Sequence, residues 1–418
     1  MRPAEVEELS AAAEAGRLHT EWAEARMPVL TSSAEAFAKT NTFAGLRCAI
    51  AVHITSETAA LARALARAGA ASVVVCSSNP RTANPAVMAS LARDGIEIIN
   101  DESSGIEEHS RNFRSVLCTR PDVIIDDGAE LIRLLHVDEE FRRLDIIGAM
   151  EETTSGVRRI RALADAGTLR FPVVNVNDAA TKHLFDNRYG TGQSALDSIM
   201  RSTNMLIAGA RVLVIGYGMC GKGIARAARG LGAQVLVAEI DPIAALEAHL
   251  DGYAVLPALD GCAVADIVVT ATGSRNVIRA DHWKSLMRGC LVVNCGHFRN
   301  ELDMAALQEI CQVEPAIVKP SVYRYDAGSS GHVLVLSDGD IGNLSAAEGN
   351  PAALMDMSFS DQLRGLAWLI EHRDRLGPQV IDLPVEIDVS VARDKLSALS
   401  VRIDSQHDDQ VEFDRSHA

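Results

Sequence analysis

The segment VLVIGYGMCGKG, residues 212–223, places three glycines directly behind four branched apolar residues. The apolar run predicts a buried strand, and Gly216, Gly218 and Gly221 follow it with the spacing GxGxxG. The first glycine permits a tight turn, the second lets the backbone approach a pyrophosphate, and the third lets the next helix pack closely on the strand. The amides at the start of that helix then face the phosphates. This segment therefore predicts a turn that binds a dinucleotide.

A second predicted strand, residues 234–238, ends at Glu239. A carboxylate at this place accepts hydrogen bonds from the ribose hydroxyls of an adenosine, and it repels a 2′-phosphate. The predicted cofactor is therefore NAD rather than NADP.

The composition narrows the class of protein. The chain has 418 residues, enough for two or three domains, and a formal net charge of −16, which disfavours nucleic acid or an anionic membrane as the main partner. It has no apolar run that could span a bilayer and no apolar signal region at its start, so we expect a cytoplasmic protein. Its eight cysteines form no CxxC pair, so neither a metal site nor a disulfide framework is predicted.

Strand and helix patterns alternate along most of the chain, which predicts an α/β protein with two doubly wound parallel-sheet domains. We expect a substrate-binding domain at residues 1–190, completed by helices returning at 351–400. A Rossmann domain is predicted at 191–350. The polar residues 401–418 are predicted to form a loose tail.

Polar residues cluster where the predicted strands end, which is where α/β folds place their active sites. His53, Asp127 and Glu152 are examples. Each alone is better explained by a helix cap or a loop hydrogen bond, but the recurrence predicts a shared cleft. In NVNDAATKHLFDNRYGTGQS, residues 175–194, Lys182 and Asp186 lie four apart, so on a helix they share one face, and a surface ion pair is the alternative.

Several segments together resemble the S-adenosylhomocysteine hydrolase family. They are GLRCAIAVHITSETAAL, IIDDGAEL, EETTSGV, the lysine-containing segment, GYGMCGKG, EIDPI, TATG and NCGHF. They occur in the family's order over residues 20–400, and the lysine-containing segment is highly specific. The resemblance implies reversible hydrolysis of S-adenosyl-L-homocysteine, or a close thioether nucleoside, to homocysteine and adenosine. Bound NAD+ oxidises the ribose at C3′, the C4′ proton is lost, the 5′ thiolate leaves, water adds, and NADH restores the alcohol. A homotetramer and a place in one-carbon metabolism are also implied.

The resemblance also assigns site residues. The implied catalytic set comprises His53, Asp127, Glu152, Lys182, Asp186 and His297. Lys182 and Asp186 would hold and deprotonate the 3′-hydroxyl, which for a lysine base requires a depressed pKa. The implied substrate contacts are Thr55, Glu57, Asn350, Met355 and Phe359, although Met355 and Phe359 could be ordinary core and His297 a structural histidine. The implied NAD contacts, with the glycine turn and Glu239, are Thr153, Thr154, Ser155, Asn187, Thr272 and Asn343.

Three departures from the family pattern leave the substrate open. Residues 81–85 read Arg-Thr-Ala-Asn-Pro where the family has a polar run, Asn350 replaces a histidine near the nucleobase, and the Lys/Tyr tail is missing. One alternative is an enzyme that uses the same 3′ oxidation on another nucleoside, as an epimerase or in a biosynthetic 5′-elimination. Another is a non-catalytic NAD-binding regulatory partner.

Overall fold

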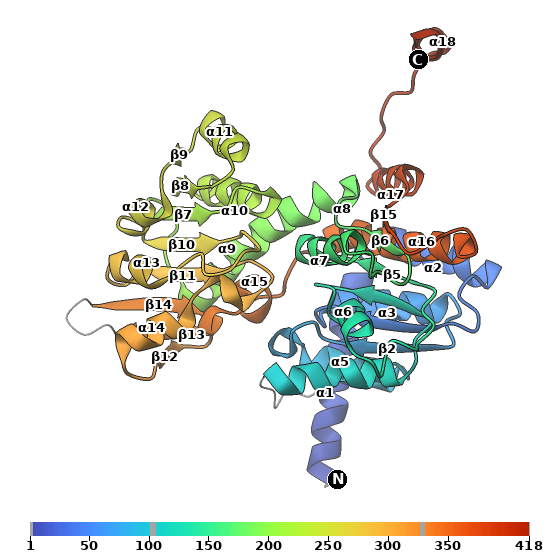
Figure 1. The fold of residues 1–418 in the computed structure, drawn as a ribbon, viewed down its shortest axis with the longest axis horizontal. Coiled ribbons are helices and arrows are strands. Elements are labelled where there is room, and N and C mark those ends of the chain that lie inside the picture. Colours follow the sequence, from blue (N-terminus) through green and yellow to red (C-terminus); the bar gives the residue numbers. More distant parts are fainter. Residues whose placement is uncertain (1–2, 101–105, 327–330, 418) are drawn as a thin grey trace.

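The chain folds into two α/β lobes that lie side by side (Figure 1). A computed structural model describes residues 3–100, 106–326 and 331–417. The first lobe is built on a seven-stranded sheet and the second lobe on an eight-stranded sheet. The two layered lobes confirm the predicted α/β class.

The sheet of the first lobe is wholly parallel and has the order β15-β6-β5-β4-β1-β2-β3. The centre is β1, whose sequence RCAIA is buried from its second residue onward. The strands are β1 (Arg47–Ala51), β2 (Ser72–Cys76), β3 (Glu97–Ile98), β4 (Val123–Asp126), β5 (Gly148–Glu151), β6 (Val173–Asn175) and β15 (Val380–Asp382).

Helices cover both faces of this sheet. Each of the helices α3 and α7 begins where a threonine hydroxyl, Thr55 or Thr153, accepts a hydrogen bond from a backbone amide of the first turn. The helices are α1 (Pro3–Glu24), α2 (Pro28–Thr40), α3 (Ser56–Arg67), η1 (Pro80–Thr82), α4 (Pro85–Arg93), α5 (Ile106–Cys118), α6 (Glu130–Val137), α7 (Thr154–Asp165) and α8 (Ala180–His183).

The second lobe has the sheet order β12-β13-β14-β11-β10-β7-β8-β9. Its strands from β14 to β9 are parallel, but β13 pairs antiparallel with both β12 and β14, so this sheet is mixed and the expectation of a wholly parallel one was wrong there. The strands are β7 (Arg211–Ile215), β8 (Gln234–Ala238), β9 (Ala254–Val255), β10 (Ile267–Thr270), β11 (Leu291–Asn294), β12 (Ala316–Lys319), β13 (Val322–Asp326) and β14 (His332–Leu336).

The helices of the second lobe surround its parallel strands (Figure 1). They are η2 (Asp186–Gly190), α9 (Thr191–Thr203), α10 (Met219–Gly230), α11 (Pro242–Leu250), α12 (Ala258–Cys262), α13 (Ala280–Ser285), η3 (Arg299–Glu301), α14 (Met304–Cys311), η5 (Ser337–Gly339) and α15 (Gly342–Ser345).

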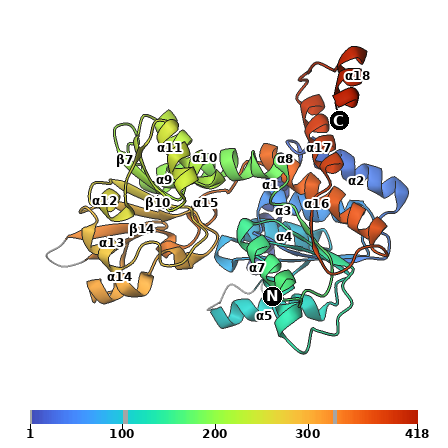
Figure 2. The same cartoon turned by 45° about the horizontal axis from the view of Figure 1, so that its top comes forward.

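The chain then returns to the first lobe through α16 (Ala352–His372) and α17 (Val385–Ala398), as predicted. Phe359, Leu363 and Leu366 of α16 belong to the same buried cluster as Ile50 of β1 and Met150 of β5. Beyond α17, an extended segment leads to α18 (Asp408–His417), which projects from the body in both views (Figures 1 and 2). The expected loose tail therefore contains a helix.

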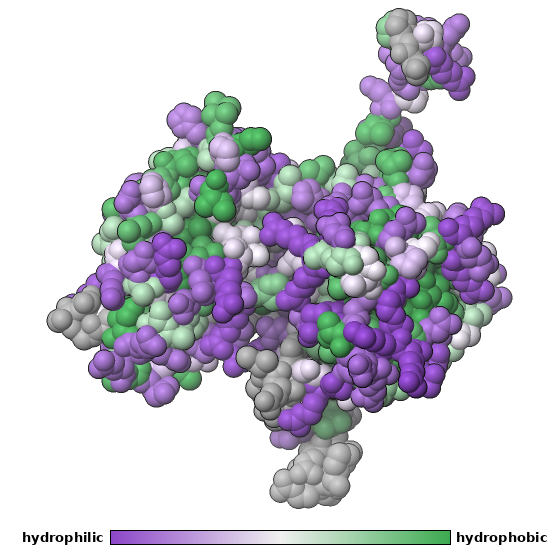
Figure 3. Space-filling model, in the orientation of Figure 1, coloured by the Kyte–Doolittle hydropathy of each residue, from purple (hydrophilic) through white to green (hydrophobic). Residues whose placement is uncertain are grey.

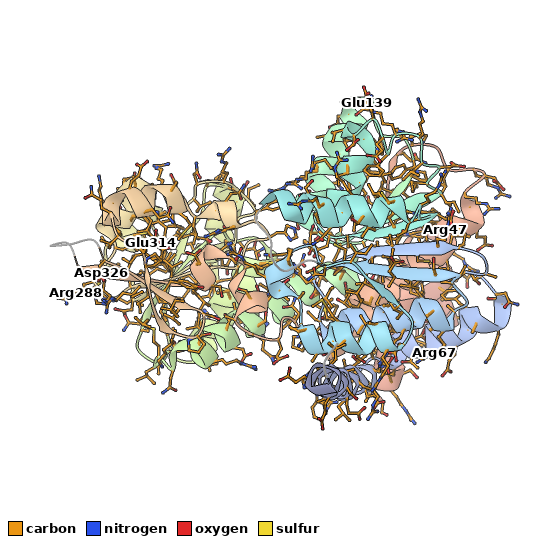
Figure 4. All side chains as sticks on the ribbon, turned by 90° about the horizontal axis from the view of Figure 1, so that it is seen from below. Arg47, Arg67, Glu139, Arg288, Glu314 and Asp326 are labelled. Carbon is orange, nitrogen blue, oxygen red and sulfur yellow. The ribbon has the colours of Figure 1, made fainter. Side chains whose placement is uncertain are left out.

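The carboxyl ends of the parallel strands in both lobes point toward the junction between them. Arg47, at the start of β1, lies at the outer end of the first lobe (Figure 4). Arg288, just before β11, lies at the opposite outer end, in the second lobe. The segments that follow these strands therefore meet between the lobes, where α/β folds bind ligands. Among the helices that the structure describes, none combines the length and apolarity that crossing a membrane requires.

Candidate active site

A cavity of about 460 Å³ lies between the two lobes, where the molecular surface is hollowed (Figure 3). It brings together residues that are far apart in the sequence. The predicted site residues that line it are His53, Thr55, Asp127, Glu152, Thr153, Thr154, Ser155, Lys182, Asp186, Asn187, Gly218, Thr272, His297, Asn343, Asn350, Met355 and Phe359. Glu57, Gly216, Gly221 and Glu239 were also predicted and do not line it.

Lys182 lies at the centre of a buried polar cluster in this cavity. Its Nζ is 2.7 Å from Asp186 Oδ2 and 3.3 Å from Glu152 Oε1, and it donates a hydrogen bond of 2.7 Å to Asn187 Oδ1. Both carboxylates and the lysine are buried, so this is no surface ion pair. The helix α8 ends at His183 and the π-type turn η2 begins at Asp186, and this break turns both side chains inward.

The charges around Lys182 contradict the expectation of a depressed pKa. Burial by itself would lower the pKa of the ammonium group, but the carboxylates of Asp186 and Glu152 outweigh burial and raise it above its ordinary value. Lys182 is therefore a cation that donates hydrogen bonds. The proton acceptor in such a pair is the carboxylate.

Glu152 is fixed by the helix α16. Ser358 Oγ donates to its Oε1 at 2.6 Å, and Gln362 Nε2 donates to its Oε2 at 2.5 Å. Burial raises the pKa of Glu152, while the nearby Lys182 opposes that shift. The carboxylate is held by donors on two sides, so its place in the cavity is well defined.

Asp127 lies between two histidines that come from different lobes. Its Oδ2 is 3.5 Å from His53 Nε2, and its Oδ1 is 3.5 Å from Nδ1 of His297, which follows β11. Oδ1 accepts no hydrogen bond from any residue in the described part of the chain, although it is buried. One ligand atom from each of the three residues lies within 4.8 Å of the others, so this cluster could hold a metal ion that the sequence did not predict.

The loop that carries Asp127 is anchored by buried carboxylates. Glu151 accepts hydrogen bonds from the amides of Gly128 and Ala129 and from Thr153, and Asp126 accepts from the amide of Ile132. Burial raises the pKa of Asp126 to about 7. These bonds fix the start of α6 and hold Asp127 at the rim of the cavity.

Asn350 contacts the lysine cluster. Its Nδ2 donates to Asp186 Oδ1 at 2.6 Å, and its Oδ1 accepts from Ser194 Oγ at 2.7 Å. We predicted Asn350 as a nucleobase contact. It lines the cavity, and its amide also orients Asp186. The sequence does not reveal this second role, because the two residues lie far apart along the chain.

The divergent segment 81–85 joins the two lobes. Arg81 Nη1 lies 2.7 Å from Asp340 Oδ2, and Asp340 belongs to the second lobe. The next residue, Thr82, is buried, and its hydroxyl lies 2.6 Å from His53 Nδ1. The segment therefore connects the lobe contact to a predicted catalytic histidine.

The glycine turn has the geometry that a dinucleotide needs. Gly216 has a φ of 96°, and a Cβ at Gly221 would lie 1.9 Å from its carbonyl oxygen. A Cβ at Gly218 would meet no atom of the described residues within 4 Å, so it would project into the open space of the cavity. The residues therefore fit a pyrophosphate bound at the start of α10.

The carboxylate of Glu239 lies against this turn. It accepts a hydrogen bond of 2.5 Å from the amide of Tyr217 and others from Ile240 and Asp241. Asn343 also lines the cavity; it is buried, and its Oδ1 accepts no hydrogen bond from the residues that the structure covers. Such an orphaned acceptor fits the carboxamide of a nicotinamide.

The predicted nucleobase residues lie along α3 and α16. Thr55 caps α3, and Glu57 lies in its first turn, where burial raises the pKa of the carboxyl. Phe359 lines the cavity and also belongs to the buried core of the first lobe. Its position is therefore compatible with both interpretations, a substrate contact and a core residue. Met355 packs against the same core and also lines the cavity.

Several cavity residues were not predicted. Asn177, two residues after the end of β6, accepts hydrogen bonds from Thr154 and Asn187, and its place after a strand was the signal that could have found it. Cys220, Cys295 and Arg158 also line the cavity. Cys220 and Cys295 lie inside the quoted segments GYGMCGKG and NCGHF, which were the signal for them, whereas no quoted segment contains Arg158.

Comparison with known families covers most of the chain. Residues 187–349 match the model of the S-adenosyl-L-homocysteine hydrolase NAD binding domain. Residues 4–146 match the model described as S-adenosyl-L-homocysteine hydrolase. The two matches lie on the second and first lobes, in the family's order.

Relatives match over nearly the whole length. An adenosylhomocysteinase of Nostoc is 45% identical over 98% of this chain and 96% of its own length. One of Aquifex aeolicus is 43% identical over 98% and 97%. An S-inosyl-L-homocysteine hydrolase of Methanocaldococcus jannaschii is 40% identical over 95% of both chains. The chain therefore belongs to the S-adenosyl-L-homocysteine hydrolase family.

Proposed function

We propose that this chain catalyses the reversible hydrolysis of S-adenosyl-L-homocysteine to homocysteine and adenosine, with NAD as its cofactor. The observation that carries the proposal is the buried set of Lys182, Asp186 and Glu152, which shares one cavity with the glycine turn of the NAD binding domain. In such a set the ammonium group can bind a sugar hydroxyl and a carboxylate can accept its proton. The full-length relatives support the same activity.

In this proposal NAD, when bound, supplies the reversible oxidation of the ribose 3′ alcohol that makes the C4′ hydrogen acidic. The Lys182 ammonium donates a hydrogen bond to the 3′ oxygen, and the Asp186 carboxylate accepts the hydroxyl proton. Glu152, held by Ser358 and Gln362, accepts hydrogen bonds from the ribose diol. These groups orient the sugar before any proton moves.

The second proton transfer is assigned to the other cluster. Asp127 and His53 lie within 3.5 Å of each other, so one accepts the C4′ proton while the other protonates the departing 5′ sulfur. The same pair then activates the water that adds at C5′. His297 reaches this cluster from the second lobe and lines the same cavity.

The nucleobase is assigned as adenine, because full-length relatives are adenosylhomocysteinases. Glu57 lies in the first turn of α3, next to the cavity residue Thr55, and is the group we assign to distinguish the exocyclic amine of adenine from the oxygen of inosine. The M. jannaschii relative is an S-inosyl-L-homocysteine hydrolase, so the base is the point of specificity to test.

A thiol-trapping assay tests the function. NAD-loaded enzyme is given S-adenosyl-L-homocysteine or S-inosyl-L-homocysteine in matched reactions, and free thiol is counted. We expect release from the adenosyl compound to exceed release from the inosyl compound by at least about tenfold, the discrimination of an unpaired buried polar group. No thiol from either compound, together with exchange at C4′ of another nucleoside, would favour the other-nucleoside alternative instead.

The proposal also includes a quaternary structure and a metabolic role. We infer a homotetramer and a place in one-carbon metabolism from family membership. The exposed apolar side chains of Ile243, Leu246 and Leu250 on α11 support an association between copies. Light scattering on the purified protein tests the tetramer, and a monomeric mass would overturn it.

A further inference from the structure

A buried chain of three side chains lies directly beneath Lys182. Asp361 of α16 and Asp388 of α17 both contact the hydroxyl of Thr181, the residue before Lys182 in α8. Asp361 Oδ2 lies 2.7 Å from Thr181 Oγ1. Thr181 and Asp361 are fully enclosed, and Asp388 is nearly so.

Asp361, Thr181 and Asp388 share a single hydroxyl hydrogen, that of Thr181. A threonine hydroxyl carries one hydrogen and so can donate to only one of two carboxylates. Asp388 also accepts hydrogen bonds from the amides of Ala180 and Thr181, at 2.6 and 2.9 Å, in the first turn of α8. Because a backbone amide donates to each of its two oxygens, Asp388 is an acceptor on both, and the hydroxyl proton of Thr181 is assigned to it.

Asp361 is left without a donor. Its Oδ1 accepts no hydrogen bond from the residues described, and its Oδ2 contacts only the oxygen of Thr181, whose hydrogen points to Asp388. If Asp361 were ionised, its Oδ2 and Thr181 Oγ1 would lie 2.7 Å apart with no hydrogen between them, and their lone pairs would repel. A protonated Asp361 instead donates its own hydrogen to Thr181 Oγ1 and completes the chain Asp361 to Thr181 to Asp388.

The charges around Asp361 favour the same form. The groups that act on it are Asp388 of α17, Glu152 after β5 and Arg364 of its own helix. The guanidinium of Arg364 is hydrogen-bonded to Ser33, Ser390 and Asp394, so it is engaged elsewhere. Burial raises the pKa of Asp361 well above its ordinary value, and Asp388 and Glu152 add to this shift. Arg364 opposes it, as a Thr181 hydroxyl turned toward Asp361 would, but that hydrogen is assigned to Asp388.

We propose that Asp361 is a protonated carboxylic acid in the working enzyme and is a positioning residue that holds Thr181, and through it Lys182, at the reacting ribose. The role of Lys182 rests on the proposed function, but the protonation of Asp361 does not. The same helix holds Glu152 through Ser358 and Gln362, so α16 positions both sides of the lysine cluster. A neutral acid does this without adding a third negative charge beside Glu152 and Asp186.

Three variants of the NAD-loaded enzyme test this. Asp361→Asn keeps a neutral donor to Thr181, so we expect kcat within about threefold of the unmodified enzyme. Asp361→Leu keeps the volume but removes the donor, and we expect kcat to fall at least about tenfold, the size of a lost buried hydrogen bond, with little change in KM. Asp388→Asn removes the carboxylate that accepts the hydrogen of Thr181, so its kcat should fall as much as that of Asp361→Leu.

Stability against pH supplies a readout that needs no substrate. If the folded-state pKa of Asp361 lies above the unfolded value, the folded state binds the extra proton, and stability falls as the pH rises from the ordinary carboxyl range through the folded pKa. Asp361→Asn should lose this component of the pH dependence. Infrared difference spectra should show the carbonyl stretch of a protonated carboxylic acid in the unmodified enzyme, and that band should vanish in Asp361→Asn.

Two results would overturn the proposal. One is an Asp361→Asn variant as impaired as Asp361→Leu while Asp388→Asn stays active, which would exchange the two roles. The other is the absence of both the acid band and the pH component. If the band is present but no thiol is released by any variant, the proposed function fails while the protonation stands.

Discussion

Nδ1 of His297, in the second lobe, lies 3.5 Å from Oδ1 of Asp127, in the first lobe. The two residues follow β11 and β4, whose carboxyl ends face each other across the junction. The proton-transfer cluster is therefore complete only when the lobes are together. A contact that holds the lobes together should affect substrate binding more than chemistry.

Arg81 supplies such a contact, through its salt bridge to Asp340. Its side chain is 53% exposed, so solvent screens the pair and we expect only about 0.2–1 kcal/mol from it. Arg81→Ala should raise KM by less than about fivefold and leave kcat nearly unchanged. Steady-state kinetics with Asp340→Asn and the double variant measure the coupling, which should shrink at high salt. A larger loss in kcat than in KM would contradict this role.

Lys182→Met should abolish most of the activity without unloading the cofactor. Removing the cation leaves Asp186 and Glu152 without their shared positive charge and the 3′ oxygen without its donor. We expect kcat to fall by about 10²- to 10⁴-fold. The control is Lys319→Met, an exposed lysine of β12 that bonds only to a backbone carbonyl at its Nζ among the described contacts. Equal activities of the two variants would remove Lys182 from the mechanism.

Asn350 should act through Asp186. Asn350→Ala removes the 2.6 Å donor, and a hydrogen bond to a charged group is worth about 1.5–3 kcal/mol, so we expect a loss of at least about tenfold in kcat. Asn350→Asp places a second carboxylate against Asp186 and should lose more. Kinetics on both substrates distinguish the roles, because a pure nucleobase contact would change the preference between adenosyl and inosyl compounds and leave kcat intact.

Two alanine substitutions separate cofactor binding from folding at the glycine turn. Gly218→Ala adds a methyl group that meets no described atom of the protein, so the apoprotein should fold normally but bind NAD more weakly. Gly221→Ala would force a Cβ to within 1.9 Å of the Gly216 carbonyl oxygen, so its apoprotein should lose thermal stability. The control is Gly230→Ala, at the end of α10, where the space is also open. Calorimetric titration with NAD and thermal melts of the apoproteins give both quantities.

The cluster of His53, Asp127 and His297 predicts a response to metal ions. We assign proton transfer to these residues, so treatment with a chelator should leave activity unchanged. Added Zn²⁺ should inhibit, because the ion would occupy the three ligand atoms that the reaction needs. Activity lost on chelation and restored by a divalent metal would instead make the cluster a metal centre.

The sequence predicted the parts of the site that follow from local rules. The glycine turn, the strand ends at His53 and Asp127, and the Lys182 segment each combine a residue type with a recognisable spacing, and the cavity brings them together. The raised pKa of Lys182, which does not meet the requirement of a lysine base, could not be predicted, because Glu152 and Asp186 approach it from separate elements. The Asp361 chain was not predicted for the same reason, since α8, α16 and α17 meet only in the folded lobe.

The tail and the mixed sheet show another limit of prediction from the sequence. The composition of residues 401–418 is polar, so the pattern favoured an irregular tail, but acidic Asp408 and Asp409 begin the short helix α18. In the second sheet, the apolar run at 332–336 predicts a strand equally well in either direction. The structure pairs it antiparallel with β13, and the direction of pairing is a property that periodicity does not report.

Rapid mixing of the NAD-loaded enzyme with S-adenosyl-L-homocysteine in deuterated water tests the central claim most directly. The absorbance of reduced nicotinamide and the deuterium content at C4′ of the released adenosine are measured together. We predict that nicotinamide is reduced transiently, that C4′ carries solvent deuterium, and that no net reduction remains. Adenosine released with neither cofactor reduction nor deuterium at C4′ would contradict the account.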